Sequence, residues 1–356
     1  MKFTYKFPAV RGVQAGREYY VSMVPLKILP KLFLSDTDAV SPEFRAQRRL
    51  NEARIPEIKD YIVNNLQSYV FSALSASIDG KYSYQSFDEQ GDIGVLEIDM
   101  ETTFLINDGQ HRKAAIEEAI KQEPSLGEET ISVVFFEDKG LERSQQMFTD
   151  LNKHAVKTSN SISTLYDSRD ERSVLTKNVI SQIPFFNLHT DKEKDNLGKY
   201  SSKLFTLNNL NRANQRIIKH KQTNDTDERF LLDYWNCVIE NIIEWQEFQQ
   251  KKLSKCDLRQ NYILCLNVTM LAFGKLGAYF YDNPTTNMKK VLKKLRTVNW
   301  QRNNSDNWGG RVIGEFGKVL TNETAVILLC NQIKKNLEIP LSKEEEEKEQ
   351  NFLINK

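Results

Sequence analysis

Four polar side chains of different chemistry follow one another near the middle of this 356-residue chain. They are the carboxylate of Asp108, the amide of Gln110, the imidazole of His111 and the guanidinium of Arg112. An imidazole titrates near neutral pH and a guanidinium pairs well with phosphate, so the group suits a phosphate-bearing ligand. We therefore take His111 and Asp108 as candidate catalytic residues, and Gly109, Gln110 and Arg112 as candidate phosphate-binding residues.

The residues on either side of this group predict a strand that turns into a helix. Residues 103–106 are apolar and β-favouring, which is typical of a buried strand. Residues 113–119 are rich in Ala and Glu, and Ala115, Ile116 and Ala119 share one helical face. The free N–H groups and the dipole at the start of a helix favour an anion. The four side chains would therefore lie beside a ready-made anion site.

The same pattern also has a purely structural interpretation. Asp108 would cap the first turn of the helix, Arg112 would pair with it, and His111 would pack without chemistry. Gly109 would serve only the turn, since glycine readily adopts a positive φ. A strand-turn-helix unit that carries charges is common, so the residues alone leave both interpretations open.

The turn at residues 107–112 contains Asp-Gly-Gln-His-Arg, which resembles the signature of the DGQHR family. With residues 17–20, 54–58 and 142–148, it is similar to the DndB family, the DNA sulfur modification proteins of bacterial phosphorothioation systems. The resemblance is strong over residues 16–170 and continues more weakly to the C-terminus. It implies a negative transcriptional regulator of the sulfur-modification operon, with double-stranded DNA and the other sulfur-modification proteins as partners.

A more distant resemblance is to the nucleotide-binding fold of ParB and sulfiredoxin, where a Gly-x-x-Arg turn lies at the start of a helix and binds phosphate. Gly109 and Arg112 match that pattern, although the two residues between them differ from those usual in ParB. In that fold an asparagine after a helix helps to hold metal or phosphate, and Asn152 looks like it. The resemblance implies a nucleoside triphosphate with Mg²⁺ as a candidate cofactor, with Asp108 and Asn152 near the metal.

Two basic clusters are candidates for contact with a DNA backbone. A helix predicted to start at residues 41–43 carries several arginines, and residues 288–302 place lysines on one helical face opposite apolar side chains. Such contacts set affinity and salt dependence but do not read sequence, and no helix-turn-helix pattern is evident. A solvated amphipathic face is the alternative. The candidate DNA-binding residues are Arg45, Arg48, Arg49, Arg54, Lys289, Lys290, Lys293 and Lys294.

Composition and the absence of several known motifs restrict the other functions that the protein could have. Basic and acidic residues number 49 and 48, so a DNA surface would have to be clustered. There is no 18-residue apolar run and no charged-then-apolar leader, and we expect a cytoplasmic protein without a membrane partner. No P-loop, nucleophile elbow or zinc-protease motif occurs. Four cysteines lack the spacing of metal ligands and are expected to be reduced, buried thiols: Cys237, Cys256, Cys265 and Cys330.

The first half of the chain mixes the patterns of strands and helices. A first strand is expected at residues 19–25, and further strands at 70–78, 93–98 and 131–136. Residues 1–170 are therefore predicted to form a ParB-like mixed α/β domain.

In the second half of the chain, the apolar residues recur mainly at the spacing of helices. Residues 230–248 and 262–280 are predicted helices, the second of them central because it is apolar almost all round. An acidic tail at residues 343–349 is expected to be frayed. Residues 171–356 are thus predicted to form a helical domain, which makes the whole chain α+β.

Three functions remain consistent with the sequence. The first is the DNA-binding regulator that the DndB resemblance implies. The second is a nucleotide hydrolase or switch, in which Arg112 holds phosphates and His111 acts as general base. The third is an assembly component that binds the other sulfur-modification proteins and has no chemistry of its own. Whether the protein is an enzyme, and whether it forms a homo-oligomer, is left open.

Overall fold

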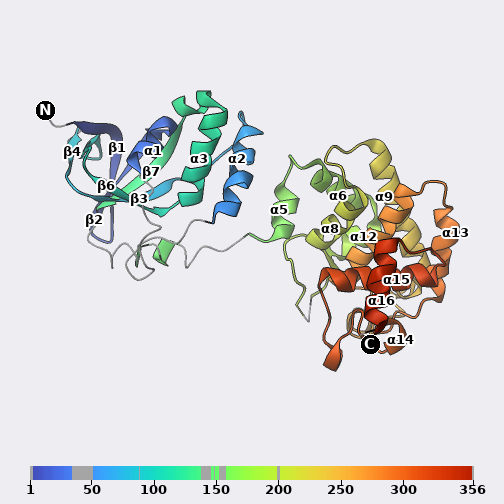
Figure 1. Ribbon diagram of the computed structural model, residues 1–356. Coiled ribbons are helices and arrows are strands. Elements are labelled where there is room, and N and C mark those ends of the chain that lie inside the picture. The colour runs from blue at the N-terminus through green and yellow to red at the C-terminus, as the bar shows by residue number, and fades with distance from the viewer. Residues whose placement is uncertain are drawn as a thin grey trace. The chain divides into compact units, whose positions relative to one another are not determined.

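A computed structural model describes residues 3–33, 51–87, 89–137, 146–147, 149–151, 158–198 and 201–354. The chain divides into two compact units, Met1–Val156 and Lys157–Lys356 (Figure 1). The N-terminal unit carries a seven-stranded sheet and the C-terminal unit is mainly helical. The predicted fold class, mixed α/β followed by helices, is confirmed.

The sheet of the N-terminal unit has the strand order β4-β5-β1-β2-β7-β3-β6. Neighbouring strands are antiparallel except for β3 and β7, which are parallel. The β7 strand is interior, as expected of its apolar sequence, and its side chains alternate between a buried face and a partly exposed one. The strands are β1 (Thr4–Gln14), β2 (Arg17–Pro25), β3 (Leu74–Asp79), β4 (Tyr82–Ser86), β5 (Ile93–Asp99), β6 (Thr103–Asp108) and β7 (Thr130–Glu137).

Helices cover the face of this sheet that bears the apolar side chains. Ala115, Ile116 and Ala119 of the longest helix are buried in the same core as Val133 and Phe135 of the sheet. That helix, α3, packs beside α2 (Figure 1). The helical segments of this unit whose bounds the structure describes are η1 (Leu26–Ile28), α1 (Leu29–Leu32), η3 (Glu52–Arg54), α2 (Ile55–Val63), α3 (Gln110–Gln122) and η4 (Pro124–Glu128).

Two strands of this unit were not anticipated from the sequence. The expected first strand at 19–25 is the second strand, because β1 precedes it and pairs with both β2 and β5. Pro8 and two charged residues, Lys6 and Arg11, interrupt the apolar alternation of β1, and such a pattern does not favour an interior strand. The β4 strand was missed because it lies at the sheet edge and none of its residues is fully buried.

The C-terminal unit packs its helices around α12, whose residues are buried almost all round, as predicted. The helices are α5 (Asn160–Tyr166), α6 (Glu171–Gln182), α7 (Pro184–His189), α8 (Leu207–Ile217), α9 (Asp225–Asn241), α10 (Ile243–Gln249), α11 (Lys255–Asn261), α12 (Asn267–Asp282), α13 (Met288–Leu292), η5 (Lys293–Thr297), α14 (Ser305–Trp308), η6 (Glu315–Gly317), α15 (Glu323–Asn336) and α16 (Lys343–Ile354). Two short parallel strands, β8 (Thr190–Asp191) and β9 (Phe205–Thr206), complete the unit.

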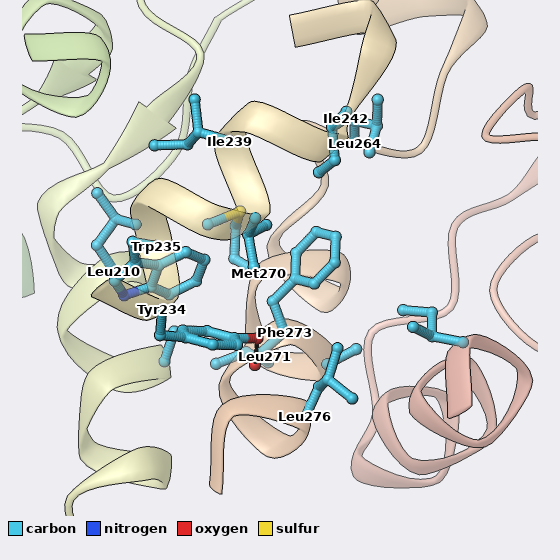
Figure 2. Packing of buried hydrophobic residues seen from close by; sticks show 14 of the residues in the cluster. Leu210, Tyr234, Trp235, Ile239, Ile242, Leu264, Met270, Leu271, Phe273 and Leu276 are labelled. Atoms are coloured by element: carbon cyan, nitrogen blue, oxygen red, sulfur yellow. Dashed lines mark hydrogen bonds between the residues drawn. The ribbon is translucent and has the colours of Figure 1, made fainter. Parts of the chain in front are cut away.

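Large aromatic side chains form the centre of this second core. Figure 2 shows Tyr234 and Trp235 of α9 packed near Phe273 of α12. Their polar atoms are satisfied, since the Tyr234 hydroxyl donates to the Phe273 carbonyl oxygen at 2.6 Å and the Trp235 indole donates to Asn214 Oδ1 at 2.8 Å. Gly274 lets α12 approach α8 closely, because a Cβ there would lie 2.6 Å from the Ala213 carbonyl oxygen.

Three expectations about the helices were wrong in detail. The helix predicted at 262–280 begins only at Asn267, because Tyr262 forms an isolated β-bridge with Gln301. The helix predicted at 230–248 is broken at Ile242, whose extended backbone (φ −98°, ψ 106°) separates α9 from α10. The acidic tail is not frayed: α16 packs on α15, and two of its carboxylates, Glu345 and Glu349, are buried.

Candidate functional site

The strand-turn-helix predicted around the pentapeptide is confirmed. The β6 strand continues through Asp108, Gly109 adopts a left-handed conformation (φ 106°), and α3 begins at Gln110. The turn needs glycine for a second reason, because a Cβ on Gly109 would lie 2.3 Å from Leu74 Cδ2. Sequence and packing therefore agree that a side chain is excluded at this corner.

Arg112 binds parts of its own protein at this corner. Its Nη1 donates to the Ser72 carbonyl oxygen at 2.6 Å, to Ser72 Oγ at 2.5 Å and to the Ala73 carbonyl oxygen at 3.0 Å. Its Nη2 pairs with Asp108 Oδ2 at 2.6 Å. The guanidinium thus ties the turn to the segment that leads into β3, and a phosphate would have to compete with these oxygens.

Asp108 has a different role from the one expected on structural grounds. The N-cap of α3 is Gly109, which has no side chain that could accept a capping hydrogen bond. Asp108 instead accepts a hydrogen bond from Arg112, four residues further along the chain. The expectation that Asp108 caps the helix was wrong, whereas its pairing with Arg112 is observed.

His111 is held by the segment that precedes α2. Its Nε2 accepts a hydrogen bond from the backbone N–H of Asn51 at 3.0 Å. In a neutral ring the proton must then reside on Nδ1. Nε2 would have to release this bond before it could accept a proton, so a general-base role for His111 requires movement of one of the two groups.

The structure adds polar residues that the sequence did not single out. Ser75 and Ser77 of β3 lie beside Asn107 of β6, on the sheet face opposite the apolar core. Asn107 Nδ2 donates to Ser77 Oγ at 2.8 Å and to Met147 Sδ at 3.1 Å. Within the described part of the chain, Asn107 Oδ1 and Ser75 Oγ have no hydrogen-bond partner although both atoms are buried. The Ser-Ala-Ser alternation of β3 was the available signal, since it interrupts a buried strand with hydroxyls on one face.

The polar groups on this sheet face are neutral, so they could bind a ligand through hydrogen bonds and not through charge. The Ser75 hydroxyl can donate a hydrogen bond, and the side-chain carbonyl oxygen of Asn107 can accept one. The described residues include no group of three or more His, Cys, Asp or Glu arranged to hold a metal ion. Asn152, expected near this turn, lies outside the residues that the structure describes, and its approach stays a prediction.

The candidate DNA-binding residues lie in both units. Arg45, Arg48 and Arg49 fall outside the described residues, whereas Arg54 is exposed in η3. The single helix expected over 288–302 is instead the short α-helix α13 followed by the 3-10 helix η5. Its apolar side packs in the core as predicted, with Leu292 and Leu295 fully buried.

Four cations project from the other side of α13 and η5, and we call them the basic ridge: Lys289, Lys290, Lys293 and Arg296. All are exposed. Lys294 is less available, because its ammonium pairs with Glu338 at 2.5 Å. Leu292 and Leu295 are buried in the core and therefore fix the orientation of these helices, so that the basic ridge faces solvent.

The cysteines are free thiols in different surroundings. Cys237 and Cys330 are buried and Cys265 is half-buried, whereas Cys256 is exposed, contrary to expectation. Burial raises the pKa of the Cys265 and Cys330 thiols to about 12, so both are protonated at neutral pH.

Fold and site together define a protein in which a sheet unit presents an Asp-Gly-Gln-His-Arg turn and a helical unit presents a basic ridge. A family model described as DndB, DNA-sulfur modification-associated, matches residues 7–340. Because this match covers nearly the whole chain, the protein belongs to the DndB family, and it is associated with DNA sulfur modification. No curated protein and no solved structure matches the chain. None of the described helices combines the length and apolar character required to cross a bilayer.

Proposed function

We propose that this protein binds double-stranded DNA and acts as a negative transcriptional regulator of the sulfur-modification operon, together with the other proteins of that system. Membership of the DndB family supports the pathway. The observation that carries the DNA-binding part is the basic ridge, an exposed row of cations on a chain whose formal net charge is only +1. Clustered charge of this kind is what a nearly neutral protein needs to hold a phosphate backbone.

The ridge accounts for affinity and not for recognition of an operator. Lysine ammoniums contact phosphates and release counterions, so each contact steepens the dependence of log K on log salt concentration by about 0.9. Phosphate contacts carry no base information. Sequence preference would have to come from another part of the protein or from the shape of the DNA.

A gel-shift titration with the operon's promoter DNA tests this proposal. The K289Q/K290Q/K293Q variant should bind at least tenfold more weakly and with a shallower salt dependence, because three phosphate contacts are removed. The matched control, K251Q/K252Q/K318Q, removes the same charge from exposed positions elsewhere in the unit and should bind like the wild type. Equal binding by the two variants contradicts the ridge, and a promoter reporter unaffected by the protein contradicts the regulatory role.

A second candidate function, nucleotide binding at the pentapeptide turn, is favoured by the unpartnered Asn107 Oδ1 and Ser75 Oγ beside the start of α3. Such atoms suit the donors and acceptors of a nucleotide, with the phosphates at the helix N-terminus. Titration with ATP, GTP and CTP in the presence of Mg²⁺ measures it, alongside release of phosphate. Loss of binding in Asn107→Leu supports this role, and absence of binding by the wild type removes it and leaves an assembly component as the alternative to regulation.

A further inference from the structure

The C-terminal unit contains a second polar site, none of whose lining residues belongs to the basic ridge. A cavity of about 390 Å³ is lined by the end of α8, one stripe of α12, and residues of α15 and α16. Its size falls within the range of small-molecule sites, roughly 300 to 1,000 Å³. Lys275, Ala278, Tyr279 and Asp282 form the α12 stripe, at spacings that place them on one helical face. The rest of α12 is mostly buried in the core, so this stripe is the side of the helix that faces the cavity.

Positive charge predominates in the cavity wall. Arg216, Lys219, Lys275 and Lys334 line it, whereas only two carboxylates, Asp282 and Glu345, do so. Three of the cations have close carboxylate partners: Glu323 accepts two hydrogen bonds from Arg216, Asp282 lies 2.9 Å from Lys219, and both Glu345 oxygens bond Lys334.

Of the four cations that line the cavity, Lys275 has the longest ion pair. Its ammonium is 3.6 Å from Glu345, a carboxylate that Lys334 already binds at 2.9 and 2.7 Å. Its side chain is 29% exposed, so it borders the cavity without being freely solvated. Lysine and arginine that converge on one space, with one charge in excess, attract an anion. The aromatic ring of Tyr279 supplies an apolar wall beside them.

We infer that this cavity binds a small phosphate-bearing molecule. Lys275 is its principal contact, and Arg216 and Lys219 are placed to hold the remaining phosphate oxygens from the α8 side. The cavity is a site for a free phosphate or a phosphate monoester, and it is independent of the DNA function proposed for the ridge.

Isothermal titration calorimetry of the full chain tests this inference, with inorganic phosphate and a nucleoside 5′-monophosphate as separate probes at constant ionic strength. Saturable binding of either probe is expected, and preference for one of them identifies the source of the phosphate. Lys275→Gln should weaken binding at least tenfold. Lys318→Gln, an exposed lysine outside the cavity lining, should leave it unchanged.

A variant that is expected to tighten phosphate binding, and not to weaken it, strengthens the test. Asp282→Asn removes a carboxylate from the cavity rim and frees Lys219, so it should tighten phosphate binding severalfold. Lys219→Gln removes an ammonium that is 67% exposed, so it should fold normally and bind severalfold more weakly. Absence of saturable binding, or equal binding by the Lys275→Gln, Lys219→Gln and Asp282→Asn variants, would overturn the inference.

Discussion

At the scale of single residues, Arg112 shows how one side chain can hold a turn together. Its guanidinium donates hydrogen bonds to Ser72, Ala73 and Asp108 at once, and the Arg112 side chain is only 16% exposed. A planar group with five N–H donors in a fixed fork suits this arrangement better than an ammonium, which has three. A loss of activity in Arg112→Ala would therefore combine lost folding with any lost ligand contact.

Replacing Arg112 by lysine should lower the free energy of unfolding of the N-terminal unit by about 2 kcal/mol, because the charge is kept but the fork of hydrogen bonds is lost. Urea denaturation followed by far-UV circular dichroism measures this change. Arg54→Lys, at an exposed position of the same unit, should change stability by less than about 0.5 kcal/mol. Equal stability of the two variants would show that the observed bonds contribute little.

Gly109 should tolerate a side chain less well than another glycine with positive φ. Gly109→Ala meets both the backbone strain at φ 106° and the buried Leu74 side chain, and it should destabilise the unit by about 2 to 3 kcal/mol. Gly16 has φ 72° with no atom near a built Cβ, so Gly16→Ala should cost only about 1 kcal/mol. Thermal unfolding of the two variants separates the strain from the clash, and a smaller loss for Gly109→Ala than for Gly16→Ala would contradict the packing argument.

At the scale of elements, α16 is held by ion pairs that are buried. Arg311 Nη1 and Nη2 bond the two Glu349 oxygens at 2.7 and 2.6 Å, and Lys335 also bonds Glu349. Burial by itself would raise the pKa of Glu349, but these hydrogen bonds outweigh it and lower the pKa to about 2. Glu345, paired with Lys334, fixes the first turn of the same helix.

Glu349→Gln should destabilise the C-terminal unit by about 3 kcal/mol at pH 7, because it leaves Arg311 and Lys335 without their counter-charge. A lowered pKa in the folded state means that the ionised carboxylate stabilises the unit above about pH 4.5, and that this stabilisation is lost as pH falls toward about 2. The difference in stability between wild type and variant should accordingly shrink between pH 5 and pH 2.5. Chemical denaturation at a series of pH values provides the measurement.

Glu346→Gln is the matched control, since Glu346 lies on the exposed side of the same helix. It should alter stability by less than about 0.5 kcal/mol at any pH in this range. A similar loss in both variants would indicate that the helix responds to net charge and not to the buried pairs.

At the scale of the whole molecule, the two units have separate cores that different probes can follow. The chain has four tryptophans, and all of them lie in the core of the C-terminal unit. The core of the sheet unit contains phenylalanine and tyrosine but no tryptophan among its described residues. Tryptophan fluorescence therefore reports on one unit and far-UV circular dichroism on both.

This division predicts which probe each variant affects. Glu349→Gln should shift the fluorescence transition in a urea titration, whereas Gly109→Ala should leave that transition in place and shift only part of the circular dichroism signal. The reason is that each substitution acts within a core of its own. Shifts of both signals by both variants, to the same extent, would mean that the units unfold as one.

Much of the local structure around the candidate sites was determined by the sequence alone. Apolar periodicity predicted the strand and the helix of the pentapeptide, and Gly109 predicted the turn between them; periodicity also predicted that residues 288–302 bury one side and expose lysines on the other. These features depend on residues a few positions apart, whose spacing fixes which side faces the core.

Only the tertiary structure decided what those side chains contact. Arg112 meets Ser72 from 40 residues earlier, and Asn107 meets Ser77 across two strands that are antiparallel neighbours. The acidic tail became an ordered helix because Arg311, 38 positions before Glu349, supplies a buried counter-charge. The physical reason is the same in each case: local spacing sets the orientation of a side chain, but the partner that satisfies its charge or hydrogen bonds is brought to it from a distant part of the chain.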